Sequence, residues 1–214
     1  MRKAAIILTI ALSFTIQLPG GDLFSFGFGR VSLFQEDPFS PETIYADWID
    51  ANNYITGSEA RLNLLGLEID GFMFKTQGEI TDVTEQGRPV YRDDISMRYF
   101  GGLIIGTSTE VASYTRLGLG VGTSLGVDVG LDRKLFFWVG DRENIYNSDT
   151  RLEFFQNIQL EYRMKMDIFI GHFVLGINYQ VPSTQANFLD ITKEALQPDW
   201  NQGRLGFTLL SRLF

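Results

Sequence analysis

The charged residues best placed to act on one another alternate with apolar residues in segment 152–168. They are Glu161, Arg163, Lys165 and Asp167. Alternate residues of a β-strand point to opposite sides, so these four side chains share one face if the segment is extended. Two carboxylates beside two cations form ion pairs, which offset the cost of removing charge from water in an enclosed space. This face is the first candidate site.

Catalytic chemistry has few candidates. His172 is the only histidine and there is no cysteine, so the sequence offers no thiol nucleophile and no pair of imidazoles for a metal. Beside Gly171, a lone histidine indicates an ordinary turn residue. The carboxylates do not follow the spacing of an EF-hand. We therefore expect no catalytic residue, no metal site and no cofactor, and we predict that the protein is not an enzyme.

The elements that carry these residues follow a period of two. In segment 115–131 one face is apolar and the other is mostly glycine. The apolar face holds Leu117, Leu119, Val121, Leu125, Val127, Val129 and Leu131. A helix does not tolerate so many glycines, whereas a strand with one crowded and one open face does. Segments 115–131 and 152–168 are both long for strands of a water-soluble domain.

The same alternation predicts an all-β fold of about eight strands. They are expected at 23–34, 60–69, 72–84, 93–106, 113–130, 151–168, 172–182 and 203–214. The pair Asp70–Gly71 indicates a tight turn. Short connections at 70–71, 107–112 and 169–171 alternate with longer ones at 35–59, 85–92, 131–150 and 183–202. Short turns at one end and long loops at the other are typical of a transmembrane barrel.

The N-terminus has the pattern of an export signal. A basic pair at 2–3 precedes an apolar run over 4–16, and a Pro-Gly breaker follows at 18–21. The run is shorter than the ~20 residues that a helix needs to span a bilayer. We therefore expect a signal peptide at 1–21 and a single barrel domain at 22–214. An uncleaved anchor is the alternative, because no clear cleavage motif is present.

Net charge separates the remaining classes. The chain carries a formal charge of -8, which argues against a nucleic-acid partner because binding phosphates requires a basic surface. A soluble two-sheet sandwich would expose the glycine-rich faces to water, and we disfavour it. A closed antiparallel transmembrane β-barrel instead turns the apolar faces to lipid and the small and charged residues inward. A soluble carrier resembling the lipocalins is the less favoured alternative.

The inward faces of such a barrel carry both signs of charge. The expected polar network, in which a gate is also possible, consists of Glu68, Lys75, Glu79, Arg98, Arg116, Glu161, Arg163 and Lys165, with Asp167 on the same side. Eight strands leave room for side chains and little else. We favour a packed polar plug over a gate that opens by exchanging ion pairs.

The end of the chain carries a resemblance. Gly203-Arg-Leu-Gly-Phe-Thr-Leu-Leu-Ser-Arg-Leu-Phe214 resembles the C-terminal strand of outer-membrane proteins, in which a final aromatic residue serves as an assembly signal. Phe214 matches this pattern, and Arg212 departs from it. Over 22–214 the chain resembles the small eight-stranded barrels of the OmpX-like, OmpW-like and OmpA-transmembrane-domain types. The resemblance implies the bacterial outer membrane, its lipid and its barrel-assembly machinery as location and partners, and it assigns no functional residue.

Two connections carry candidate contact residues. The loop 35–59 is acidic and lacks Lys and Arg. Ser40 and Pro41 predict a helix start there, with Tyr45 and Trp48 on the helix. Its apolar side either binds a partner or packs on the barrel rim.

The connection at 131–150 carries Phe136 and Trp138, which form either an adhesive patch or part of an aromatic girdle. A second short helix is expected at 190–196.

Two functions therefore remain open. The first is a surface or structural protein whose loops contact lipids or an extracellular partner of unknown identity. The alternative is a narrow, porin-like channel for small solutes.

Overall fold

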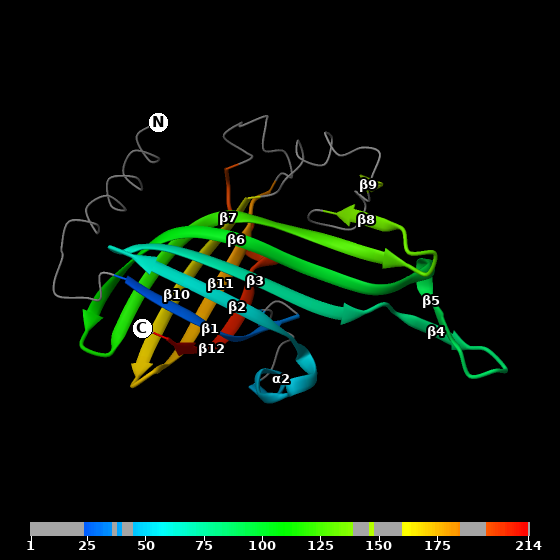
Figure 1. Ribbon diagram of the computed structural model, residues 1–214, viewed down its shortest axis with the longest axis horizontal. Coiled ribbons are helices and arrows are strands. Elements are labelled where there is room, and N and C mark those ends of the chain that lie inside the picture. Colours follow the sequence, from blue (N-terminus) through cyan, green and yellow to red (C-terminus); the bar gives the residue numbers. More distant parts are fainter. Residues whose placement is uncertain are drawn as a thin grey trace.

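The computed structural model describes residues 24–35, 38–39, 45–138, 146–147, 160–184 and 196–213 (Figure 1). The expected signal peptide at 1–21, most of the expected helix at 190–196, the first part of the strand expected at 151–168, and Phe214 lie outside these residues. Within the described part, no helix is both long enough and apolar enough to cross a bilayer.

Eight antiparallel strands form a closed ring, which confirms the predicted fold class. In chain order they are β1 (Phe24–Phe34), β2 (Tyr54–Leu64), β3 (Leu67–Gln77), β6 (Ile95–Ala112), β7 (Thr115–Gly130), β10 (Leu160–Ile170), β11 (Phe173–Pro182) and β12 (Arg204–Arg212). Neighbours in sequence pair with one another. The ring closes where β1 pairs with β12, for example Gly27 opposite Arg212, while β7 pairs with β10 across the longest connection. A closed ring leaves no free sheet edge.

Smaller elements extend the end of the ring where the long connections lie. They are α2 (Tyr45–Ile49), the 3-10 turns η1 (Ala51–Asn53), η2 (Arg92–Asp94) and η4 (Trp200–Gln202), and strands β4 (Ile80–Val83), β5 (Pro89–Tyr91), β8 (Leu135–Trp138) and β9 (Tyr146–Asn147). The β4–β5 hairpin projects beyond the ring in Figure 1, and β8 pairs with the C-terminal part of β7. The helix expected in the first long loop is confirmed as the single turn α2.

The predicted turn at Asp70–Gly71 is wrong, because both residues lie inside β3. The chain reverses instead at Leu65 and Gly66, which have φ of 53° and 84° and join the paired residues Leu64 and Leu67. A two-residue hairpin of this kind needs positive φ at both central positions, which glycine supplies without strain. The turn expected within 107–112 also lies elsewhere. Strand β6 continues to Ala112, and the chain reverses at residues 113–114, before β7 begins.

The interior has two layers. Toward the long-connection end lies an apolar core, where the pair Arg98–Asp128 also points inward; the core consists of Val31, Leu33, Phe72, Phe74 and Ile104. Toward the short-turn end the inward side chains are mostly charged. Along β3, which begins at the short-turn end, Glu68 and Asp70 come before Phe72 and Phe74, so one strand contributes to both layers.

Candidate functional site

The charged layer is built by strands on opposite walls of the ring. Four steps around the ring separate β10 from β2, which places them at opposite ends of a diameter. Nη1 of Arg61 in β2 lies 2.6 Å from Oδ2 of Asp167 in β10. Nη2 of Arg163 in β10 lies 2.7 Å from Oε2 of Glu59 in β2. These two ion pairs span the lumen.

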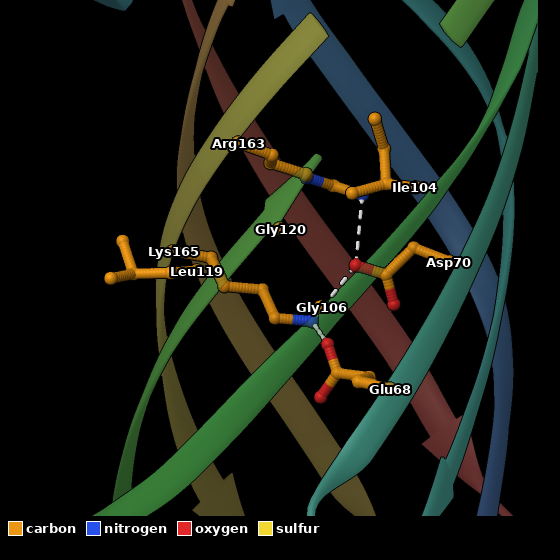
Figure 2. Close-up of a pocket in the computed structure, with 8 residues that line it drawn as sticks. All are labelled: Glu68, Asp70, Ile104, Gly106, Leu119, Gly120, Arg163 and Lys165. Carbon is orange, nitrogen blue, oxygen red and sulfur yellow. Dashed lines mark hydrogen bonds and ion pairs between the residues drawn. The ribbon is translucent and has the colours of Figure 1, made fainter. Parts of the chain in front are cut away.

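Strand β3 supplies the carboxylates that join the two pairs. Asp70 receives Nη1 of Arg163 at 3.2 Å and Nζ of Lys165 at 2.8 Å on one oxygen, and Nε of Arg61 lies 3.1 Å from the other. Lys165 also pairs with Glu68. Figure 2 shows Arg163 and Lys165 reaching from their strand toward the carboxylates of β3, while Leu119 points away. A single connected group results.

We call this group the interior network. It consists of Glu59, Arg61, Glu68, Asp70, Arg163, Lys165 and Asp167, all of them buried. Three cations face four carboxylates. Buried charges at these distances stabilise one another only as a set, because removing one partner leaves an uncompensated charge, at a cost of about 3–5 kcal/mol.

The glycines of β7 make room for the network. A Cβ added to Gly118 would lie 2.7 Å from Cε of Lys165, and one added to Gly120 would lie 2.5 Å from Cγ2 of Ile104. A cavity within the network, lined by Lys165, Asp70 and their neighbours in Figure 2, measures about 10 Å³. That is close to the lower limit for one water molecule. Side chains therefore fill this level of the lumen.

The other predicted inward residues lie in pairs around the network. Glu161 accepts a hydrogen bond from Oγ of Ser124. Nε of Arg98 lies 3.5 Å from Asp128, toward the long-connection end. Nη2 of Arg116 pairs with Glu110 at 3.2 Å near the short turns. The structure places six of the predicted residues on the inward side: Glu68, Arg98, Arg116, Glu161, Arg163 and Lys165.

Two predicted members are wrong. Lys75 points outward, exposed, with Nζ 5.9 Å from the centre of the Tyr99 ring. Glu79 lies beyond the end of β3 and pairs with Arg92 in the exposed β4–β5 region. The misplaced turn is the cause. Because β3 runs unbroken from Leu67 and Glu68 points inward, the even-numbered residues of this strand point inward. The odd-numbered Lys75 therefore points outward.

Sequence reasoning missed Glu59, Arg61 and Asp70. The elements expected from the sequence place Glu59 in a loop, Arg61 at the start of a strand and Asp70 in a turn. The missed signal is the alternation that begins at Glu59, in which polar residues at 59, 61 and 63 separate apolar residues at 60, 62 and 64. Followed backward along the chain, it would have placed these residues on the inward face of β2.

The candidate loop residues divide between the rim and the lumen. Trp48 in α2 contacts the ring of Phe39 at 6.4 Å between centres, and its carbonyl oxygen accepts a hydrogen bond from the Tyr54 hydroxyl. The side chain of Tyr45 lies outside what the structure describes. The helix thus packs at the rim.

In β8, Nε1 of Trp138 donates to Asp128 at 3.1 Å, and its ring stacks on Phe100 at 5.8 Å. Trp138 therefore covers inward residues at the mouth of the lumen and is not part of a lipid-facing girdle. Phe136 on the same strand is half-buried.

One loop pair has a perturbed acidity. In the connection between β7 and β8, Nζ of Lys134 lies 2.7 Å from Oδ2 of Asp132, on the exposed surface. The hydrogen bond from the Lys134 side chain, with a second from its backbone, lowers the pKa of Asp132 below its ordinary value. The same contact raises the pKa of Lys134.

The ring and its contents define the class of protein. Large apolar side chains stand outward on every ring strand while charges are buried inside, the reverse of a water-soluble protein. This is the architecture of the small eight-stranded outer-membrane barrels, as the sequence predicts.

Comparison with known proteins finds likeness among solved structures. No family model matches the chain, and no curated protein matches it. The chain is similar to Ail, the attachment invasion locus protein of Yersinia pestis, solved in complex with the heparin analogue sucrose octasulfate, with 13% identity, a TM-score of 0.40, and coverage of 88% of this chain and 95% of that chain. A second Ail structure has 13% identity, a TM-score of 0.38 and the same coverage.

Proposed function

We propose that this chain is an integral β-barrel of the bacterial outer membrane, exported by a signal peptide, with its long connections at the cell surface. The support is its outward wall, which carries at least one exposed large apolar residue on each ring strand. Examples are Phe28, Leu64, Met73, Leu103, Leu119, Met166, Leu175 and Leu209. Such a surface promotes association in water, whereas acyl chains cover it, and a closed ring pairs its strand backbones internally.

Fractionation and heat-modifiable gel migration test this location. The protein should be found in the outer-membrane fraction and migrate as a compact band that shifts on boiling. A chain without residues 1–21 that is monodisperse in water without detergent would contradict the proposal and favour the soluble carrier.

We further infer a surface or structural role, without catalysis, in preference to transport. The observation that carries this inference is the interior network, in which Arg61 and Arg163 bridge opposite walls. The apolar core with Phe72 and Phe74 occupies part of the lumen next to it, toward the long-connection end. A solute would have to displace both layers. The parts left free to act are the outer wall and the long connections, including the rim helix α2.

Planar-bilayer recording of the purified barrel distinguishes the two functions. We expect no steady single-channel openings from the wild type. Steady openings that change in Arg163→Ala or Arg98→Ala would instead establish the alternative, a narrow channel gated by the ion pairs. Arg92→Ala is the matched control, because Arg92 is exposed outside the ring.

The proposal also covers partners. Lipid contacts the outward wall, and the barrel-assembly machinery recognises the C-terminal strand. In the structure that strand is β12, which pairs with β1 and β11. A chain lacking Phe214 should accumulate outside the membrane. Normal insertion of that variant would remove Phe214 as an assembly signal.

A further inference from the structure

Along the described ring strands, the outward wall carries charge at two positions. Fourteen other charged residues of the ring strands point inward, and the two exceptions are Arg30 in β1 and Lys75 in β3. Arg30 is exposed and lies between inward Gly29 and buried Val31, while Lys75 follows buried Phe74. Both exceptions are cations. A cation on a lipid-facing wall is costly at the bilayer centre and is tolerated near the headgroups.

The two cations stand on the same part of the wall. Arg30 pairs with Ser58 of β2, and Ser58 pairs with Met73 of β3, two residues before Lys75. Two strand spacings, about 10 Å, therefore separate the cations across the sheet, and two residues, about 7 Å, separate them along the strands. Long Arg and Lys side chains can converge over such a gap.

Hydroxyl groups occupy the space between the cations. Ser32 of β1 lies opposite Thr56 of β2, with 3.3 Å between their hydroxyl oxygens. Thr56 and Ser58 both point outward from β2, between the strands that carry Arg30 and Lys75. We call these five residues the outer patch: Arg30, Ser32, Thr56, Ser58 and Lys75. Two cations and three hydroxyls are the donor set that suits a phosphate group.

Aromatic residues beside the outer patch indicate its position relative to the membrane interface. Tyr99 lies opposite Lys75. Tyr54 lies on the outward wall nearer the long connections, and its ring centre is 5.9 Å from that of outward Phe207. Tyrosine is typical of the interface between acyl chains and headgroups. Among the described residues, neither Arg30 nor Lys75 lies within ion-pair distance of a carboxylate. The cations thus face the level at which lipid phosphates lie.

We propose that the outer patch binds the phosphate-bearing headgroup of an anionic lipid in the leaflet on the long-connection side. The lipid supplies the counter-charge that the wall lacks. Its acyl chains lie along the apolar residues below the patch, such as Phe28 and Leu103. This inference rests on the proposed membrane location and adds a lipid partner to it.

Lipid retention measured by native mass spectrometry tests the proposal. The full barrel is reconstituted in vesicles that contain phosphatidylcholine and phosphatidylglycerol, and the ratio of the two retained lipids is measured. The wild type should retain phosphatidylglycerol preferentially. Arg30→Gln with Lys75→Gln should reduce that preference about thirtyfold, because each cation near an anionic surface contributes a factor of about five to lipid binding. Arg30→Lys with Lys75→Arg should keep it.

The matched control removes the same two charges elsewhere. Arg92→Gln with Lys134→Gln lies outside the ring strands and should leave the preference unchanged. An equal loss in both double variants overturns the proposal, as does displacement of the lipid by inorganic phosphate. A wild type that inserts but shows no preference overturns the proposal and leaves the membrane barrel standing. A wild type that does not insert overturns both. The single variant Lys75→Gln allows the same comparison of lipid preference with the wild type and changes the barrel wall at one position instead of two.

Discussion

Arg61 and Asp167 meet across the full width of the barrel, with 2.6 Å between Nη1 and Oδ2, although 106 residues separate them in sequence. Their strands share no backbone pairing, so only side chains connect these two walls. The contact therefore ties together halves of the ring that the sheet alone joins only around its circumference.

Removing one cation from the interior network should destabilise the barrel strongly. Arg61→Leu leaves Asp167 and Glu59 without their shared partner, and the expected loss is about 3–5 kcal/mol of unfolding free energy. Urea unfolding followed by heat-modifiable migration measures it. Arg92→Leu removes an exposed pair and should cost at most about 1 kcal/mol. Equal losses of unfolding free energy in the two variants would show that the ion pairs across the lumen stabilise the barrel no more than an exposed pair does.

Removing a pair together should cost less than the sum of its single changes. Lys165→Met leaves Glu68 with only Nε of Arg61, 3.8 Å away, and Glu68→Gln leaves Lys165 with Asp70 alone. The double variant removes opposite charges together, so we expect a coupling of about 1–3 kcal/mol in the unfolding free energy. Strictly additive losses would contradict the network.

A side chain at Gly118, directly opposite Lys165 on the neighbouring strand β7, should disturb the network. Its Cβ would lie 2.7 Å from Cε of Lys165, whose ammonium group is held by Asp70. Gly118→Val should cost about 1–3 kcal/mol of unfolding free energy by overpacking. Gly71→Val is the control, because the nearest atom to its added Cβ is 4.0 Å away, on Leu103.

Single cysteines can report which face meets lipid, since the chain has no cysteine of its own. A spin label at Leu119, which is 53% exposed, should collide with oxygen dissolved in the bilayer and avoid a water-soluble nickel chelate. A label at Leu160 should behave in the same way. Ser124 points inward and serves as the comparison, expected to be shielded from oxygen in the lipid. Labels at both outward positions that meet only the chelate would contradict a lipid-facing wall.

The pH response of one loop pair follows from its hydrogen bonds. Because Lys134 donates to Asp132, the lowered pKa of Asp132 gives a contribution to folding that is present above its unfolded pKa and lost as the pH falls through the folded pKa. Lys134→Gln should raise the pKa of Asp132, measured by NMR titration of its carboxyl carbon. An unchanged pKa would exclude Lys134 as the cause.

Much of the ring could be predicted from period-two alternation alone. In β7 and β10 the pattern is long and regular, so the inward direction of Arg116, Glu161 and Arg163 followed directly. Strict alternation suffices where a strand has one apolar and one polar face, because a slip by one residue would exchange the faces.

The part around β2 and β3 could not be predicted from the same rule. Asp70–Gly71 has the composition of a hairpin turn, while the actual turn requires Leu65 to adopt a positive φ, which leucine rarely does. Tertiary contacts decide between the two, since Asp70 binds three cations of the interior network. The sequence therefore predicts Lys75 on the inward face, whereas the structure places it outward, in the outer patch.

Closure of the ring through β1 and β12 has a kinetic consequence. Gly27 and Arg212 must find each other although nearly the whole described chain lies between them. No earlier portion of the polypeptide can complete the cylinder, so a nascent or truncated chain presents two open sheet edges. Such non-local pairing is slow. The sheet therefore loses its last two open edges only when β12 docks on β1, so every shorter portion of the described chain keeps backbone groups available to pair with another strand.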